Sequence, residues 1–280
     1  MDNLDQFLDH ALREDIGDGD HTSKACIPDN IKGSAHLLIK DHGILAGVTV
    51  AQKVFEKIDK ELRFALYFED GNPVQPGDIV FDIQGNARSI LLGERLALNI
   101  MQHMSGIATQ TKEYVNQVKG LKTIILDTRK TTPGMRFLDK EAVRIGGGEN
   151  HRMGLYDMIM IKDNHIDYLG SIEDAINAVT RYLKEYHKSL HIVIEARDME
   201  NVHRILDHGG INRIMFDNFS LEDTREAVRI IDGRFETESS GRITLENVRA
   251  YALCGVDYIS IGALTHQIKS LDMSLKAVVK

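Results

Sequence analysis

The chain has 280 residues, 42% of them hydrophobic and 27% charged, and 42 acidic against 34 basic residues give it a net charge of −8. This length and composition suffice for a large core, which excludes disorder and any need for disulfide staples. The acidic balance argues against broad nucleic-acid binding. No apolar run is long enough for a membrane span and no signal peptide is recognisable, so we expect a cytoplasmic protein. Cys26 and Cys254 are the only cysteines, which excludes cysteine-based zinc sites.

The first hundred residues predict a separate lobe of helices and short strands. Alternating apolar residues predict strands at 35–39, 64–68 and 79–83, and turn sequences rich in glycine and proline separate them. Apolar residues at helical spacing then predict one long amphipathic helix; they are Leu92, Leu96, Ile100, Met104 and Ile107. We expect this helix to connect an N-terminal domain, residues 1–107, to a C-terminal domain, residues 108–280.

The C-terminal part alternates short apolar runs with helices that carry an apolar stripe. The runs cover residues 122–126, 158–161, 191–194, 213–216, 234–237 and 258–261. The predicted helices cover residues 171–186, 198–208, 220–232 and 244–254. This alternation predicts right-handed βαβ units and a parallel sheet. A structure related to the eight-stranded α/β barrel fits better than a dinucleotide-binding sheet, because no Gly-rich dinucleotide turn is present.

Charged residues follow these predicted strands, where the working groups of parallel barrels project. Arg129, Lys130 and Lys162 follow the early runs, whereas Glu195 and Asp217 follow later ones. The window from Arg129 to His165 holds seven basic and five acidic residues, so it carries +2 within an acidic protein. Basic groups suit carboxylates and phosphates, and two carboxylates suit magnesium or sugar hydroxyls.

The last two predicted strands end in small residues. Ser240-Gly241 and Gly262-Ala263 stand where the final loops of a barrel often hold a phosphate with backbone N–H groups. The residues together predict a site for a phosphorylated sugar and a carboxylated partner. They do not name the reaction.

Several longer stretches resemble the quinolinate phosphoribosyltransferase family, and the likeness covers essentially the whole chain. These stretches are Glu14-Asp15-Ile16-Gly17, Glu94-Arg95-Leu96-Ala97-Leu98-Asn99, Asp127-Thr128-Arg129-Lys130-Thr131-Thr132-Pro133-Gly134, Asn150-His151-Arg152 with Gly154-Leu155, Ile161-Lys162-Asp163-Asn164-His165 and Gly262-Ala263-Leu264-Thr265-His266. The resemblance implies an N-terminal α/β sandwich lobe, a C-terminal incomplete (β/α) barrel with parallel strands, and a homodimer. It also implies the reaction of quinolinate with 5-phosphoribosyl 1-pyrophosphate and magnesium to give nicotinate mononucleotide, pyrophosphate and carbon dioxide, in NAD biosynthesis.

The resemblance also implies roles for individual residues. Quinolinate binding falls to Arg129, His151, Arg152 and Lys162, and Arg95 is expected to reach the neighbouring subunit's site. Lys130 is expected on the pyrophosphate side, and Glu195 and Asp217 near the ribose hydroxyls and magnesium, directly or through water. The 5-phosphate region comprises Ser240, Gly241, Gly262, Ala263 and His266. Lys130, Lys162, Glu195 and Asp217 are the expected catalytic residues.

Two residues depart from the family pattern. Val193 stands where a second glutamate is common, two residues before Glu195, and Arg242 replaces the last glycine of a Ser-Gly-Gly sequence. The first departure is expected to alter packing or metal affinity. The second puts the backbone geometry near the phosphate in question.

Three other interpretations stay open. A Schiff-base lyase would use Lys162 as its nucleophile but offers no role for the arginines. A non-catalytic barrel would bind quinolinate and leave it unchanged. A paralogous phosphoribosyltransferase would act on another aromatic acid.

Overall fold

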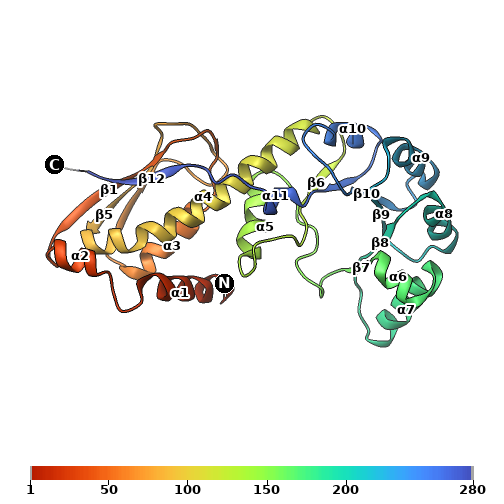
Figure 1. The fold of residues 1–280 in the computed structure, drawn as a ribbon, viewed down its shortest axis with the longest axis horizontal. Helices are drawn as coiled ribbons and strands as arrows, with labels where there is room; N and C mark the ends of the chain where they lie inside the picture. The colour runs from red at the N-terminus through yellow and green to blue at the C-terminus, as the bar shows by residue number, and fades with distance from the viewer. Residues whose placement is uncertain (1, 279–280) are drawn as a thin grey trace. The chain divides into compact units, whose positions relative to one another are not determined.

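The computed structural model describes residues 2–278 and shows a mixed α/β protein with one antiparallel and one parallel sheet (Figure 1). The chain forms two compact units. The first comprises the residues up to Lys112, Thr132–Gly147 and the residues from Gln267 onward; the second comprises Glu113–Thr131 and Gly148–His266. The expected division into domains 1–107 and 108–280 stays a prediction.

The first unit contains a four-stranded antiparallel sheet. Its strands, in spatial order, are β12 (Met273–Ala277), β1 (Lys32–Ile39), β5 (Ile79–Asn86) and β3 (Arg63–Leu66). Two shorter strands, β2 (Gly43–Ile44) and β4 (Pro73–Val74), form a separate pair. Ala35, Leu37 and Ile39 of β1 are buried in alternation, because successive side chains of a strand point to opposite faces.

Helices supply the rest of the core of the first unit. They are α1 (Asp2–Ile16), α2 (His21–Cys26), α3 (Val48–Ile58), α5 (Arg136–Ile145) and most of α4 (Ala87–Gln117). Phe64 joins α3 to the sheet, since its ring lies 5.7 Å from that of Phe55 and 5.3 Å from that of Phe81. A Cβ at Gly93 of α4 would lie 2.6 Å from the ring of Phe55, so glycine allows α4 to approach α3 closely.

The second unit contains a six-stranded parallel sheet. Its strands, in spatial order, are β6 (Ile124–Leu126), β11 (Tyr258–Ser260), β10 (Glu236–Ser240), β9 (Arg213–Asp217), β8 (Ile192–Ala196) and β7 (Ile159–Ile161). The sheet ends at β6 and β7, which do not pair with each other. The expected parallel, incomplete barrel is therefore confirmed.

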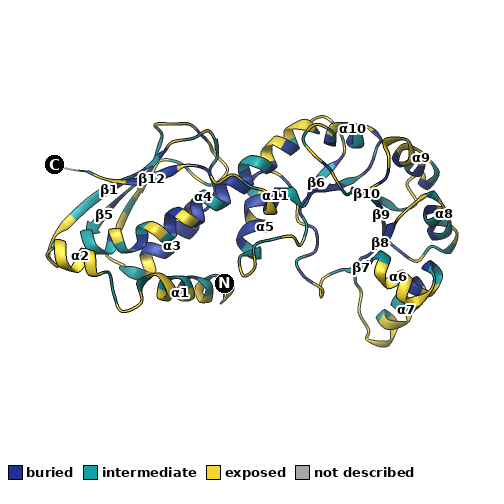
Figure 2. Ribbon diagram, viewed as in Figure 1, coloured by how far each residue is buried: buried dark blue, intermediate teal, exposed yellow. Residues whose placement is uncertain are grey.

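Helices follow the strands of this sheet. They are α6 (Asp163–Leu169), α7 (Ile172–Glu185), α8 (Met199–His208), α9 (Leu221–Ile231), α10 (Val248–Leu253) and α11 (Ala263–His266). Ser171, Asp198 and Ser220 cap the N-termini of α7, α8 and α9, where each side chain accepts a backbone N–H three residues ahead. Figure 2 shows β8 buried along its length, whereas α6 has no buried residue.

Three predicted boundaries were wrong. Glu195 lies inside β8 instead of following it, and the strand expected at 234–237 is shifted to Glu236–Ser240. The helix expected from residue 244 begins at Val248. The two strands were misplaced because apolar runs were used to find them, whereas both strands contain charged residues with ionic partners: Lys162 after β7 for Glu195, and Arg213 on β9 for Glu236 and Glu238.

No helix within residues 2–278 is long and apolar enough to cross a membrane.

The close approach of α4 and α3 gives a stability prediction. Gly93→Ala should lower the free energy of unfolding by about 1–3 kcal/mol, because the new methyl group overlaps Phe55 and Ile58. Denaturant unfolding measures this change. Asn116→Ala, at an exposed position of the same helix, is the control and should change stability by about 0.5 kcal/mol or less. Stabilisation by Gly93→Ala, the usual result in a helix interior, would contradict the packing described here.

Candidate active site

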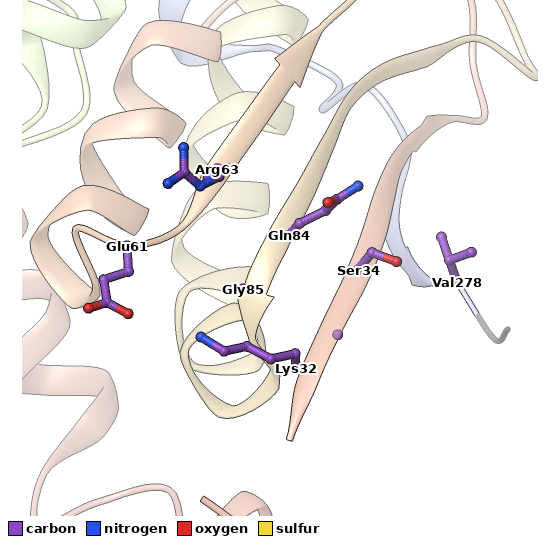
Figure 3. A pocket seen from close by; sticks show the side chains of 8 residues that line it. Lys32, Ser34, Glu61, Arg63, Gln84, Gly85 and Val278 are labelled. Atoms are coloured by element: carbon purple, nitrogen blue, oxygen red, sulfur yellow. The ribbon is translucent and has the colours of Figure 1, made fainter. Parts of the chain in front are cut away.

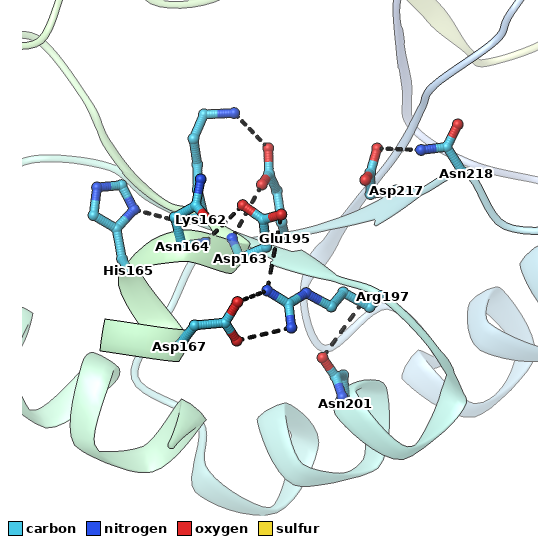
Figure 4. Close-up of polar contacts among 10 residues, drawn as sticks. All are labelled: Lys162, Asp163, Asn164, His165, Asp167, Glu195, Arg197, Asn201, Asp217 and Asn218. Atoms are coloured by element: carbon cyan, nitrogen blue, oxygen red, sulfur yellow. Dashed lines mark hydrogen bonds and ion pairs between the residues drawn. The ribbon is translucent and has the colours of Figure 1, made fainter. Parts of the chain in front are cut away.

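An ion pair joins the ends of β7 and β8. Lys162 follows β7, and its Nζ lies 2.7 Å from Oε1 of Glu195 on β8. Oε2 of Glu195 accepts the N–H of Asp163, the first residue of α6, at 3.4 Å (Figure 4). Side-chain exposure is 43% for Lys162 and 11% for Glu195, so the ammonium group is the more accessible partner.

Asp217 ends the neighbouring strand β9, on the same face of the sheet as Glu195. The strand register pairs Glu195 with Met215, and Asp217 stands two residues further along β9. Oδ1 of Asp217 accepts from the amide of Asn218 at 3.0 Å (Figure 4). The carboxylates expected to serve the ribose and metal therefore lie on adjacent strands.

Gly241 packs against Asn218 at the ends of β10 and β9. A Cβ at Gly241 would lie 2.4 Å from Oδ1 of Asn218, and the φ of Gly241 is +89°. Asn218 itself has a φ of +58°, and its N–H donates to the carbonyl of Ser240. The predicted phosphate residues Ser240 and Gly241 are thus tied to the loop that carries Asp217.

A second group joins the ends of β6 and β11. A Cβ at Gly262 would lie 2.9 Å from Cδ of Lys130 and 3.1 Å from Nε2 of His266, so both side chains lie over this glycine. The Thr265 hydroxyl donates to the carbonyl of Lys130 at 2.9 Å. The structure therefore brings together Lys130, Gly262 and His266, whose expected roles toward pyrophosphate and the 5-phosphate stay predictions.

Two arginines of the predicted site, Arg129 and Arg152, act on each other electrostatically. Burial lowers the pKa of Arg152, and the positive charge of Arg129 lowers it further, against the opposing effect of Asp157 and Glu195. Arg152 is 8% exposed and donates to the carbonyl of Met158 at 3.0 Å. Arg129 is exposed, and its guanidinium makes no hydrogen bond or ion pair with another described residue. Two guanidinium groups that repel each other, of which Arg129 has no bonded partner, favour an anionic ligand.

His151 lies apart from the exposed cations. Its side chain is only 4% exposed, with Nε2 3.3 Å from Oε2 of Glu238. Its backbone N–H donates to Oδ1 of the buried Asp127, which follows β6, at 2.9 Å. His151 precedes Arg152, but its ring contacts the inside of the sheet.

Sequence reasoning missed a buried charge network on the face of the sheet that carries Asp217. Arg213 of β9 donates to Glu238 through Nη1 and to Glu236 through Nε, each at 2.9 Å. Its guanidinium carbon lies 3.7 Å from the centre of the Tyr258 ring. Burial raises the pKa of Glu238, but His151 and Arg213 outweigh that effect and the net pKa is lowered. The sequence does carry a signal for this network: the polar residues Glu236, Glu238 and Ser240 alternate, which places all three on one face of a strand.

The two departures from the family pattern have distinct structural settings. Val193 is fully buried and pairs in register with Arg213, so a glutamate there would face an arginine that β10 already neutralises. Arg242 has a φ of +52°, in the left-handed region that glycine favours. The backbone conformation suited to glycine is therefore kept at Arg242.

Arg95 lies on α4 in the first unit and is exposed. Its guanidinium makes no hydrogen bond or ion pair with another residue of the described chain. A hollow of about 230 Å³ surrounds it, lined also by Glu14, Asp15 and Asn99. The expected role of Arg95 at a neighbouring subunit's site stays a prediction.

A larger hollow, of about 510 Å³, lies on the antiparallel sheet (Figure 3). Lys32, Glu61 and Arg63 line it and are exposed. It contains none of the predicted site residues, and its size alone does not make it the functional site.

The carboxylates of Glu195 and Asp217 do not complete a metal site by themselves, so a bound metal ion would need further oxygen ligands from the substrate. Within residues 2–278, no three His, Cys, Asp or Glu side chains gather as a metal site. Glu195 and Asp217 nevertheless offer carboxylate oxygens on adjacent strands. Magnesium commonly uses one or two carboxylates together with substrate phosphates and water, so this pair fits such an ion.

An open parallel barrel with unpaired cations and two carboxylates at its strand ends is typical of enzymes that act on anionic, phosphorylated small molecules. The comparisons identify the family. Its C-terminal domain model, "Quinolinate phosphoribosyl transferase, C-terminal domain", matches residues 107–276, and the N-terminal domain model matches residues 20–105. The chain belongs to the quinolinate phosphoribosyltransferase family.

Named relatives agree with this assignment. The chain is 45% identical to quinolinate phosphoribosyltransferase [decarboxylating] 2b, mitochondrial, of Nicotiana tabacum, over 98% of this chain and 82% of that protein. It is 40% identical to the probable nicotinate-nucleotide pyrophosphorylase [carboxylating] of Bacillus subtilis, over 97% and 92%. The crystal structure of NadC from Streptococcus pyogenes matches with a TM-score of 0.92 and 38% identity, over 99% of this chain and 97% of that one.

Gly241 gives a test of how tightly the site loops are packed. Gly241→Ala should lower the free energy of unfolding by about 2–4 kcal/mol, because it adds a clash with Asn218 to the cost of a left-handed alanine. Gly255→Ala is a matched control, since Gly255 has a φ of +90° but a Cβ there would meet only Val228, at 3.6 Å. The control should lose about 1–2 kcal/mol. If both variants lose the same free energy of unfolding in denaturant, the side chain of Asn218 moves away from the new methyl group without an energetic cost.

Proposed function

We propose that this chain transfers the phosphoribosyl group of 5-phosphoribosyl 1-pyrophosphate to quinolinate with loss of carbon dioxide, giving nicotinate mononucleotide and pyrophosphate in NAD biosynthesis. It is then a nicotinate-nucleotide diphosphorylase of the carboxylating type. The names of the relatives support this reaction. The observation that carries it is the cationic group at the strand ends: the charges of Arg129 and Arg152 act on each other, and Lys162 forms an ion pair with Glu195.

Quinolinate is a dianion, and this cluster matches its charge. Arg129, Arg152 and Lys162 supply three cations, of which Lys162 is already paired with a carboxylate. An incoming carboxylate competes with Glu195 for Lys162 and leaves Glu195 available to the ribose. Arginine suits planar carboxylates because it donates two parallel hydrogen bonds.

The transfer step forms one bond and breaks another. The ring nitrogen of quinolinate attacks the anomeric carbon while the bond from that carbon to the pyrophosphate oxygen breaks, and positive charge grows on the ribose. Glu195 and Asp217 stabilise that charge, and Lys130 stabilises the leaving pyrophosphate. Ser240, Gly241, Gly262, Ala263 and His266 hold the 5-phosphate. Loss of the 2-carboxylate then passes its bonding electrons to the pyridinium ring, and a proton replaces it.

Glu195 and Asp217 would hold a magnesium ion, which when bound neutralises pyrophosphate charge. The chain's own contribution is to orient both substrates and place charge around them.

The rival interpretations fit the site less well. A Schiff-base nucleophile needs an amine that is free to attack a carbonyl group, whereas Nζ of Lys162 donates to Oε1 of Glu195 at 2.7 Å. A binding protein would have no use for paired carboxylates opposite the cations. A paralogous enzyme for another aromatic acid differs only in its substrate, which the assay below decides.

We further propose a homodimer in the cytoplasm. The unpartnered guanidinium of Arg95 supports a contribution to a neighbouring subunit's site. The names of the plant relatives include mitochondrial and chloroplastic forms, so the cytoplasmic location is proposed for this chain alone.

The activity itself is the first test. Purified protein with quinolinate, phosphoribosyl pyrophosphate and magnesium should release carbon dioxide and pyrophosphate, and a chelator should stop the release. Lys162→Ala should lower kcat/KM for quinolinate by about 10²-fold, as the loss of a charge-assisted contact of about 3 kcal/mol implies. Lys188→Ala, at an exposed lysine outside the site, should keep the wild-type value. No turnover by the wild type, or turnover only with another aromatic acid, would refute the assignment.

Mixed dimers test the role of Arg95. Arg95→Ala and Lys162→Ala subunits, each nearly inactive alone, should regain about a quarter of wild-type activity after 1:1 subunit exchange. Half of the dimers are then mixed, and each mixed dimer has one intact site. Mass spectrometry of differently tagged subunits confirms exchange. Activity at the level of the parents despite exchange would place the action of Arg95 within its own subunit.

A further inference from the structure

Helix α6 begins directly after Lys162 and has no buried residue, so apolar packing contributes little to its position. Two contacts of the candidate site nevertheless depend on where this helix begins. Nζ of Lys162 donates to Oε1 of Glu195 at 2.7 Å, and the N–H of Asp163 donates to Oε2 at 3.4 Å. A displacement of α6 would therefore change the surroundings of the Glu195 carboxylate.

Arg197 links α6 to the segment that follows β8. Its Nη1 and Nη2 donate to Oδ1 and Oδ2 of Asp167 at 2.8 and 2.6 Å, and Nη2 lies 3.8 Å from Oδ2 of Asp163 (Figure 4). Two parallel hydrogen bonds fix direction as well as distance. Because Arg197 stands two residues after Glu195, its guanidinium joins the helix that follows Lys162 to the strand that carries Glu195.

This ion pair lies at the surface. Side-chain exposure is 42% for Arg197 and 56% for Asp167. Exposed ion pairs contribute little to the stability of a whole domain. A short helix without buried residues belongs to the least stable parts of a fold, so a single bidentate pair has its effect there, on local order.

We propose that Arg197 is a positioning residue of the candidate site. Its ion pair with Asp167 holds α6 in place, and the position of α6 in turn sets where Lys162 meets Glu195. In this role the guanidinium of Arg197 acts through α6 and does not contact the substrate. The proposal rests on the proposed function, since it names the residue that orders one of the cations for quinolinate.

Two single variants separate this role from an effect of charge alone. Arg197→Ala removes a cation and Asp167→Ala removes an anion, so charge alone would weaken binding of the dianion quinolinate in the first variant and strengthen it in the second. We expect the Kd for quinolinate, measured by calorimetry, to rise about fivefold in both, because either change releases α6. Alanine favours a helix more than aspartate does, so Asp167→Ala does not weaken α6 by itself. The double variant should also lose about fivefold, since both changes remove one contact.

The pair of Arg204 on α8 and Glu173 on α7 is the matched control. Its two hydrogen bonds, at 2.9 and 2.5 Å, and its side-chain exposures of 39% and 38% resemble those of the Arg197–Asp167 pair. It joins two helices that carry none of the predicted site residues, so Arg204→Ala and Glu173→Ala should keep the wild-type Kd. An unchanged Kd in Arg197→Ala, or an unchanged or lower Kd in Asp167→Ala, would overturn the proposal.

Hydrogen exchange tests the position of α6 in protein without substrate. The amides of α6 should exchange about fivefold faster in Arg197→Ala and Asp167→Ala than in the wild type, whereas those of α9 should keep the wild-type rate. Wild-type exchange in α6 would overturn the proposal, whatever the effect on binding. Absence of quinolinate binding by the wild type would instead refute the proposed function, while exchange in α6 still tests the role of Arg197. Thermal unfolding, expected to stay near that of the wild type, shows that each variant is folded.

Discussion

The buried ion pair between Arg213 and Glu238 is the constraint around which the parallel sheet is arranged. Both side chains are almost fully removed from water, so each requires the other, and removal of one partner from such a pair typically costs about 3–5 kcal/mol. Glu236 from the neighbouring strand β10 and Tyr258 from β11, the next strand beyond it, complete the surroundings of Arg213. The charge of Arg213 thereby links β9, β10 and β11 in the buried part of the sheet, where most sheets are held together by apolar packing.

The same pair connects the inside of the sheet with its functional edge. Glu238 faces His151, and His151 accepts the N–H of Arg152, whose guanidinium lies near Arg129 and Glu195. Arg152 is therefore held by its backbone, while its charge is free to act on a ligand. Burial lowers the pKa of Arg152 and the charge of Arg129 lowers it further, so the charged form of Arg152 carries an electrostatic cost that a dianionic substrate would reduce.

The carboxylates of the proposed site are held differently from Arg152. Glu195 is neutralised by Lys162, so this part of the site is balanced before any ligand binds. Asp217 is bonded to Asn218, whose left-handed backbone contacts Gly241. The ribose side of the proposed site thus depends on tight loop packing, and the quinolinate side depends on charge.

The sequence by itself determined the parallel sheet, because apolar runs and capped amphipathic helices alternate regularly from Lys122 onward, and both signals are local. It also determined the chemical types at the strand ends, since Lys162, Glu195 and Asp217 stand directly at or after such runs. Only the tertiary structure decided what these residues contact. Arg213, Glu238 and His151 lie far apart in the chain and meet through strand register, which no local pattern encodes. The polar alternation in β10 was misread for that reason: a glutamate is buried there only because an arginine on the adjacent strand neutralises it.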